Sequence, residues 1–159
     1  MIIAGIDPGL QNTGIAAIEK FDRTYQLMTC DRIETRTDVA FEIRLKTIYD
    51  KLTEFIECYL PDQIALEEIF YAQNAKVALK MGHARGVTLL AAANQGVPVS
   101  EYSAREIKLS VTGNGNASKH QVQQMICRIL NINIASASYD VSDAMAVAYC
   151  HSQRLNNRR

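Results

Sequence analysis

The chain has 159 residues, of which 48% are apolar and 21% are charged, and its formal net charge is zero. This length and composition predict a single globular domain over residues 1–159 that needs no disulfide or metal staple to fold. Its four cysteines show no CxxC spacing, which argues against a zinc or redox motif and favours buried thiols in a reducing compartment. Because no basic leader and no apolar run of membrane-spanning length is present, we expect a cytoplasmic protein with no membrane contact.

The charges are distributed unevenly along the chain. Residues 71–128 contain seven Lys or Arg but only two acids, and a basic tail at about 152–159 adds three Arg. This layout could present one basic face to phosphate groups. Solvated helix faces explain the same pattern equally well.

The first part of the chain predicts strands followed by a helix. Residues 2–7 form an apolar strand, 13–19 its hairpin partner, and 25–35 a third, weakly alternating strand. Apolar residues then recur at three- and four-residue steps, which predicts an amphipathic helix over about 38–59 that ends before Pro61.

The middle of the chain predicts another strand and another helix. Residues 63–70, "QIALEEIF", form a short apolar strand, and residues from about 74 to 95 form a helix. Gly82 and Gly86 lie four apart within this helix, where each costs roughly 1 kcal/mol relative to Ala. This spacing indicates that another backbone packs closely there, either the chain's own sheet or a second copy of the helix.

The last part of the chain predicts one strand and three helices. Residues 97–102 form the strand, and two capping boxes follow, Ser103 with Glu106 and Ser118 with Gln121. The predicted helices cover about 104–111, 119–130 and 139–154. Hairpin strands followed by strand–helix alternation predict an α/β fold with a mixed sheet and helices on both faces.

Acidic residues occupy unusual places in this predicted fold. Asp7 ends the first strand, Glu67 and Glu68 follow the apolar "IAL", and Asp140 and Asp143 begin the last helix. Clustered carboxylates without His or Cys suit Mg²⁺ or Mn²⁺ rather than zinc. Taken singly, each acid has a structural explanation about as often as a functional one. Periodicity does not choose between Glu67 and Glu68, although adjacent strand residues should face opposite sides.

Six segments, in order, carry a resemblance to a known family: "GIDPGLQNTG", "IALEEIF", "NAKVALKMGHARG", "IKLSVTGNG", "ASKHQVQ" and "DVSDAMAVA". Together they resemble the RuvC family of bacterial Holliday junction resolvases over residues from about 2 to 150. The resemblance implies a ribonuclease H-like fold with a five-stranded mixed sheet. It also implies a homodimer and two Mg²⁺ ions per subunit, for which Mn²⁺ can substitute.

The resemblance also assigns residue roles. It implies catalytic and metal-binding roles for Asp7, Glu67, Asp140 and Asp143, and so favours Glu67 over Glu68. The family's downstream lysines fall on Lys108 and Lys119. Lys119 is the fifth predicted catalytic residue, and it would hold the substrate phosphate or offset charge in the transition state. The family's aromatic residue falls on Phe70, which would stack on bases at the crossover, although a core Phe is about as common.

The activity implied is that of a Mg²⁺-dependent crossover junction endodeoxyribonuclease in DNA recombination and repair. Such an enzyme resolves a four-way junction by paired nicks in strands of like polarity and leaves 5′-phosphate and 3′-hydroxyl ends. Two cations roughly 3.5–4 Å apart would clamp the scissile phosphate. The alternatives are an inactive branched-DNA-binding scaffold of the same fold and, because of "GIDPG", an actin-like ATP-binding module.

The expected partners follow from the same resemblance. Four-way junction DNA would contact Phe70 and a set of basic residues: Lys76, Lys80, Arg85, Arg105, Lys108 and Lys119. The homodimer would form through the helix predicted at 74–95, and the RuvA and RuvB branch-migration complex would direct the enzyme.

Overall fold

The structure is a computed structural model that describes residues 1–22, 24–68, 75–133 and 137–156. In chain order its elements are β1 (Ile2–Asp7), β2 (Asn12–Phe21), β3 (Thr24–Glu34), α1 (Phe41–Tyr59), β4 (Gln63–Glu67), α2 (Ala75–Asn94), β5 (Val99–Tyr102), α3 (Ala104–Thr112), α4 (Lys119–Ile129) and α5 (Tyr139–Asn156). The described part of the chain has no helix long and apolar enough to span a bilayer.

The strands form one mixed sheet in the order β3-β2-β1-β4-β5. Strands β1, β2 and β3 are joined by hairpins and pair antiparallel, whereas β4 and β5 are reached through helices and run parallel to β1. This arrangement places the carboxyl ends of β1, β4 and β5 at the same edge of the sheet. Functional residues of open α/β sheets gather at such an edge.

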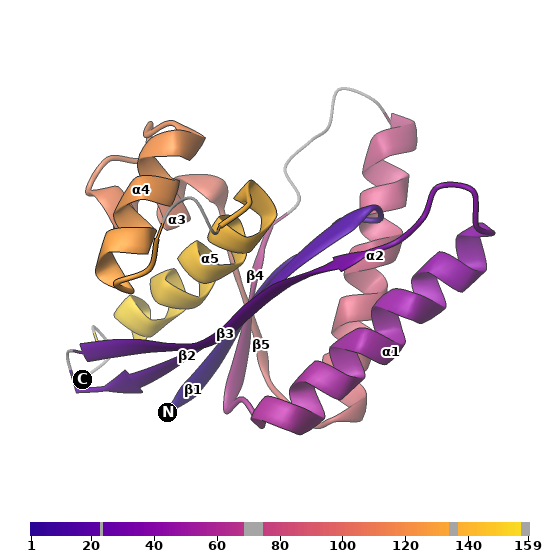
Figure 1. The fold of residues 1–159 in the computed structure, drawn as a ribbon, viewed down its shortest axis with the longest axis horizontal. Coiled ribbons are helices and arrows are strands. Elements are labelled where there is room, and N and C mark those ends of the chain that lie inside the picture. Colours follow the sequence, from indigo (N-terminus) through magenta and orange to yellow (C-terminus); the bar gives the residue numbers. More distant parts are fainter. Residues whose placement is uncertain (23, 69–74, 134–136, 157–159) are drawn as a thin grey trace.

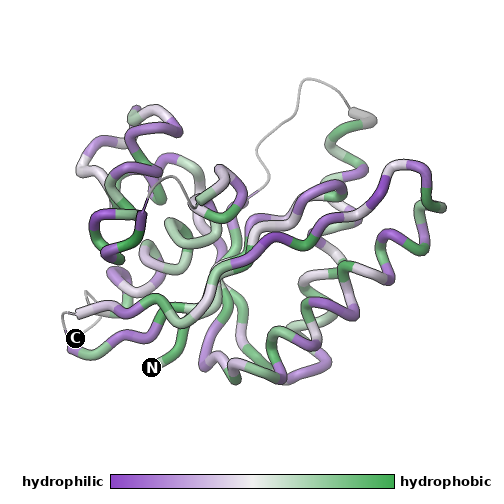
Figure 2. Tube along the Cα trace, in the orientation of Figure 1, coloured by the Kyte–Doolittle hydropathy of each residue, from purple (hydrophilic) through white to green (hydrophobic). Residues whose placement is uncertain are grey.

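Helices cover both faces of the sheet, as the sequence predicts (Figure 1). Helices α1 and α2 pack on one face, and α3, α4 and α5 pack on the other. Figure 2 shows α1 alternating between hydrophobic and hydrophilic residues. Its buried residues Ile48, Leu52, Phe55 and Ile56 follow the three- and four-residue spacing of an amphipathic helix.

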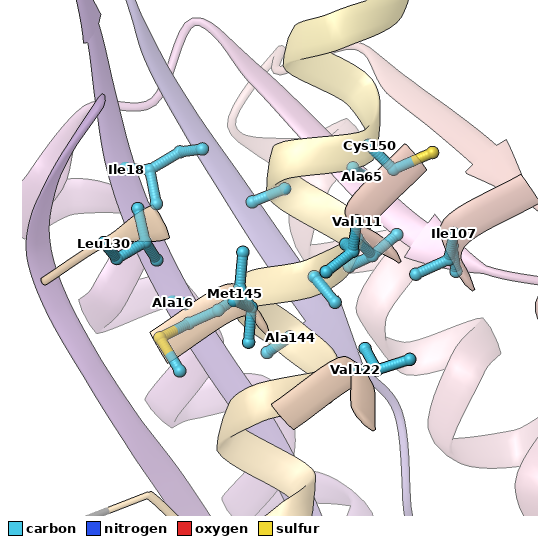
Figure 3. Packing of buried hydrophobic residues seen from close by; sticks show 14 of the residues in the cluster. Ala16, Ile18, Ala65, Ile107, Val111, Val122, Leu130, Ala144, Met145 and Cys150 are labelled. Atoms are coloured by element: carbon cyan, nitrogen blue, oxygen red, sulfur yellow. The ribbon is translucent and has the colours of Figure 1, made fainter. Parts of the chain in front are cut away.

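Helix α5 lies unusually close to the strands. A Cβ atom built on Gly5 would lie 1.9 Å from the carbonyl oxygen of Ala144, so only glycine allows this contact. Around it, Met145 and Ala144 pack with Ala16 and Val122 in the core shown in Figure 3. The close approach fixes the first turns of α5 over β1 and β2.

The predicted elements are confirmed, with shifted ends. Both capping boxes are present, so α3 begins after Ser103 and α4 after Ser118. Helix α1 begins three residues later than predicted and ends at Tyr59, where Leu60 takes a left-handed conformation before Pro61. Strand β4 ends at Glu67 rather than at 70, and residues 69–74 lie outside the described residues.

Gly82 and Gly86 do not pack on their own sheet. A Cβ atom built on either glycine would meet no atom within 4 Å. Of the two explanations that the sequence leaves open, the structure therefore excludes close packing within the described part of this chain. The surface of α2 at these glycines is open.

Candidate active site

Asp7 and Glu67 lie at the carboxyl ends of neighbouring parallel strands. Ile6 of β1 pairs with Leu66 of β4, and Asp7 and Glu67 are the residues that directly follow this pair. Ala65, two residues before Glu67, belongs to the core on the α5 side of the sheet. Because side chains alternate along a strand, Glu67 faces the same side.

Asp140 and Asp143 approach this edge from the beginning of α5. Their spacing of three places both on one face of the helix. A Cβ atom on Gly14 would lie 1.9 Å from the carbonyl oxygen of Asp140, so glycine lets α5 begin directly on β2. Gly14 in turn pairs with Asp7 in the sheet. The backbone thus brings acids separated by more than 130 positions to one edge.

A single pocket collects the five residues predicted to be catalytic. Its volume is about 390 Å³, and it opens at the carboxyl ends of β1 and β4. The residues that line it are Asp7, Pro8, Gly9, Asn12, Glu67, Glu68, Met81, Lys119, Asp140 and Asp143. The lining contains five carboxyl groups and one amine, so the described wall of the pocket is strongly acidic.

Two basic side chains pair with the acids of α5. Lys119, the first residue of α4, donates a hydrogen bond from Nζ to Oδ2 of Asp143 at 3.0 Å. Arg32 of β3 lies 3.7 Å from Asp140 and also pairs with Glu34. The capping box before Lys119 fixes the start of α4 and so places the amine near the pocket.

Three carboxyl groups of the pocket have raised pKa values, so their surroundings disfavour the ionised form. Burial raises the pKa of Asp7 to about 7, and the negative charges of Asp143 and Glu67 add to the effect. Burial likewise raises the pKa values of Glu67 and Asp143, although Lys119 opposes both shifts. Burial alone would lower the pKa of Lys119, but its interactions with Asp143, Asp7 and Glu67 together outweigh burial and raise the pKa.

The donor set fits a hard divalent cation by its chemistry. Among the described lining residues the pocket offers no His or Cys. It offers carboxylate oxygens, which are the ligands that Mg²⁺ and Mn²⁺ prefer. As the side chains stand, no three His, Cys, Asp or Glu residues within 1–22, 24–68, 75–133 and 137–156 converge closely enough to hold a metal ion. Binding would therefore require side-chain rearrangement in a pocket where Lys119 already pairs with Asp143.

Glu67 and Glu68 are not separated as the sequence suggests. The alternation of strand residues predicts that they face opposite sides, but both line the pocket. The strand ends at Glu67, so the alternation ends with it. Glu67 is half-buried and has a raised pKa, caused first by burial and then by Asp143, whereas Glu68 is exposed.

The basic residues predicted to contact DNA lie in different environments. Lys80 on α2 and Arg105 on α3 are exposed, and Lys108 on α3 is near enough to lower the pKa of Glu67 slightly. Arg85 forms an ion pair with Glu101 and is 24% exposed, so its charge is already partly compensated. Phe70 and the side chain of Lys76 lie outside the described residues.

Residues beyond those predicted also contribute to the site. Asn12 and Met81 line the pocket, and Arg32 pairs with Asp140. Arg32 lies beside Gly14 in the β2–β3 register, so finding it from the sequence would have required the exact pairing of two strands. No motif identifies Met81, because it reaches the pocket from a helix on the opposite face of the sheet.

Known proteins resemble this chain along nearly its whole length. The model of the family described as crossover junction endodeoxyribonuclease RuvC matches residues 3–151. The chain belongs to the RuvC family. Crossover junction endodeoxyribonuclease RuvC from Syntrophotalea carbinolica is 50% identical over 152 residues, which cover 96% of this chain and 94% of that protein. The protein of the same name from Desulforamulus reducens is 44% identical over 153 residues, with the same coverage of both chains.

Solved RuvC structures share the whole fold. T. thermophilus RuvC in complex with a Holliday junction substrate superposes with a TM-score of 0.94 at 30% identity, covering 99% of this chain and 96% of that one. The fowlpox virus resolvase, at 15% identity and a TM-score of 0.58, shares the fold alone. The mixed sheet with helices on both faces is thus the ribonuclease H-like fold of these resolvases, as the resemblance implies.

Proposed function

We propose that this chain is an endodeoxyribonuclease that resolves four-way DNA junctions by phosphodiester hydrolysis. One observation carries the proposal: in a RuvC family chain, four carboxylates from β1, β4 and α5 and one lysine from α4 line the same pocket. An inactive scaffold of this fold would not need to keep so many mutually repelling acids together. The raised pKa values of Asp7, Glu67 and Asp143, caused mainly by burial, mean that the cluster is costly without a cation.

Four acids would hold the cation, which we propose to be Mg²⁺, two ions per subunit, with Mn²⁺ as a substitute. Asp7 follows the β1–β4 register beside Glu67 and pairs on its other side with Gly14, against which Asp140 lies, so it is the proposed central ligand, with Glu67, Asp140 and Asp143 around it. When bound, divalent ions supply an activated water at neutral pH and stabilise the leaving 3′ oxygen. The products would be 5′-phosphate and 3′-hydroxyl ends.

Basic residues near the pocket would bind the DNA backbone. Lys119 pairs with Asp143 but is mostly exposed, so a change of rotamer would let its amine donate to a phosphate oxygen at the pocket mouth. Lys80, Arg105 and Lys108 would provide the salt-dependent contacts away from the cut. The predicted contacts of Phe70 and Lys76 remain part of the proposal.

The active unit is proposed to be a homodimer formed through α2. Gly82 and Gly86 have open space above them and allow a second backbone to approach closely. Around them α2 exposes Val77 by 47%, Leu79 by 65% and Leu90 by 53%, more apolar surface than a solvent-facing helix needs. A two-fold dimer would present two identical sites to a substrate with its own approximate two-fold symmetry.

The proposal extends to the RuvA and RuvB proteins as partners, which rests on the family resemblance alone. Co-elution of this chain with a RuvA–RuvB–junction complex would test that part separately from catalysis.

The proposed activity is tested with a synthetic four-way junction and a linear duplex of the same sequence. We expect the wild type to cut the junction symmetrically with Mg²⁺, to leave it intact in EDTA, and to spare the linear duplex. Ligation of the products would confirm 5′-phosphate ends. Binding to the junction without any Mg²⁺- or Mn²⁺-dependent cleavage would instead identify a scaffold protein.

A further inference from the structure

Lys119 stands where a cation is needed in the acidic pocket. Its Nζ donates to Asp143 Oδ2 at 3.0 Å, and it is also attracted electrostatically to Asp7 and Glu67. Apart from the five acids, the other described lining residues are uncharged. Within the described lining, the positive charge that faces the acids is therefore the amine of Lys119.

The side chain of Lys119 is free to leave this position without disturbing the fold. It is 69% exposed, whereas the Asp143 side chain with which it pairs is only 15% exposed. The backbone at Lys119 is held separately by the reciprocal hydrogen bonds of Ser118 and Gln121. Leaving the ion pair therefore needs a change of rotamer and no movement of α4.

A divalent cation held by these carboxylates would compete with Lys119 for Asp143, the carboxylate that the lysine contacts. A metal ion bound by Asp7, Glu67 and Asp143 would lie close to the amine and repel it. The described acids do not converge on a metal position while Lys119 is paired with Asp143. If Lys119 and a divalent ion exclude one another, this explains both the Lys119–Asp143 pair and the lack of convergence of the acids.

We infer that Lys119 is a displaceable counter-ion: it neutralises the carboxylate pocket before metal binds, and leaves Asp143 for the substrate phosphate once metal is bound. The inference rests on the proposed function, because it assumes that the pocket holds a divalent ion. It goes further by coupling two steps. The lysine becomes available to DNA only in a subunit that is already loaded for cleavage.

Amine labelling of the wild-type protein tests the displacement directly. Brief acetylation followed by peptide mass spectrometry measures the reactivity of each lysine without DNA, across a Mg²⁺ titration. We expect the labelling rate of Lys119 to rise three-fold or more on saturation with Mg²⁺. Lys46 is the matched control, because it is also 69% exposed and ion-paired with an aspartate, Asp50, but lies on α1 away from the pocket. Its rate should not change.

Metal affinity gives a second readout. We expect Lys119→Met to bind Mg²⁺ about 3–10-fold more tightly by calorimetry and to melt at a lower temperature than the wild type in EDTA. Lys46→Met should match the wild type in both.

The failure of the inference and that of the proposed function have different signatures. If Mg²⁺ stabilises the wild type and the Glu67→Gln variant loses this effect, the metal site stands; unchanged Lys119 labelling would then refute displacement alone. If Mg²⁺ neither binds to nor stabilises the wild type, both the metal site and the inference are wrong.

Discussion

Replacing Asp7 with Asn should stabilise the metal-free protein while destroying its function. Burial raises the pKa of Asp7 from 3.8 to about 7, with Asp143 and Glu67 adding to the shift, so ionising this carboxyl opposes folding at neutral pH. At about 1.4 kcal/mol for each pKa unit, the cost at pH 8 has an upper bound of about 4.5 kcal/mol. Side-chain relaxation and water entry reduce this, and we expect Asp7→Asn to gain about 1–3 kcal/mol. For a chain of this size the gain corresponds to a melting temperature higher by roughly 3–8 °C.

The stability difference between Asp7→Asn and the wild type should depend on pH. An aspartate with a raised pKa is neutral in both folded and unfolded states below about pH 3.8, so the two proteins should be equally stable there. The advantage of Asp7→Asn should grow between about pH 4 and 7 and then level off. Thermal melts in EDTA from pH 4 to 9 measure it.

The matched control is Glu68→Gln, which removes the same charge from the same pocket but at an exposed side chain. It should change the melting temperature by less than half as much as Asp7→Asn. Equal stability of Asp7→Asn and wild type at pH 8, or a difference that does not vary with pH, would refute the electrostatic reasoning.

Three further predictions concern the site, the dimer and the DNA contacts. Glu67→Gln should abolish junction cleavage, whereas Glu68→Gln should retain it; the reverse result would shift the assignment by one residue. Leu90→Glu should give a monomer by light scattering, and this monomer should nick a cruciform plasmid without linearising it. The control Leu109→Glu should stay dimeric, because Leu109 is similarly exposed, 51% against 53% for Leu90, but lies on α3. Lys80→Ala should weaken junction binding and reduce the slope of log K against log salt by about one, without changing the single-turnover rate at saturation; an unchanged slope would remove its phosphate contact.

Local signals predicted the elements of this fold well because they act over a few residues. The two capping boxes fixed the starts of α3 and α4, and the three- to four-residue spacing in α1 identified its buried face. The end of β4 and the start of α1 carry no such signal: Ala40, which precedes α1, makes no side-chain cap, and the apolar run of β4 continues past the strand's last residue, Glu67. Strand order follows instead from pairing between distant segments.

The sequence predicted which types of residue form the site, but it did not predict the contacts between them. Carboxylates at strand ends suggested a metal, and the family resemblance selected Glu67, but periodicity offered no way to bring Asp7 next to Asp143. The pairing of Lys119 with Asp143 and of Arg85 with Glu101 depends on elements that meet only in the folded chain. The open surface at Gly82 and Gly86 could not be predicted either, because their spacing fits packing against the chain's own sheet as well as against a second copy of the helix.

The central claim is that the carboxylate pocket performs cleavage and that most of the affinity for DNA comes from basic residues outside it. The most direct measurement compares wild type and Asp7→Asn on one labelled four-way junction, with single-turnover cleavage followed in Mg²⁺ and binding followed by gel shift in EDTA. We predict that Asp7→Asn binds the junction within about three-fold of the wild-type affinity and cuts it at least a thousand-fold more slowly, a barrier increase of about 4 kcal/mol. Near-normal cleavage by Asp7→Asn would contradict the account.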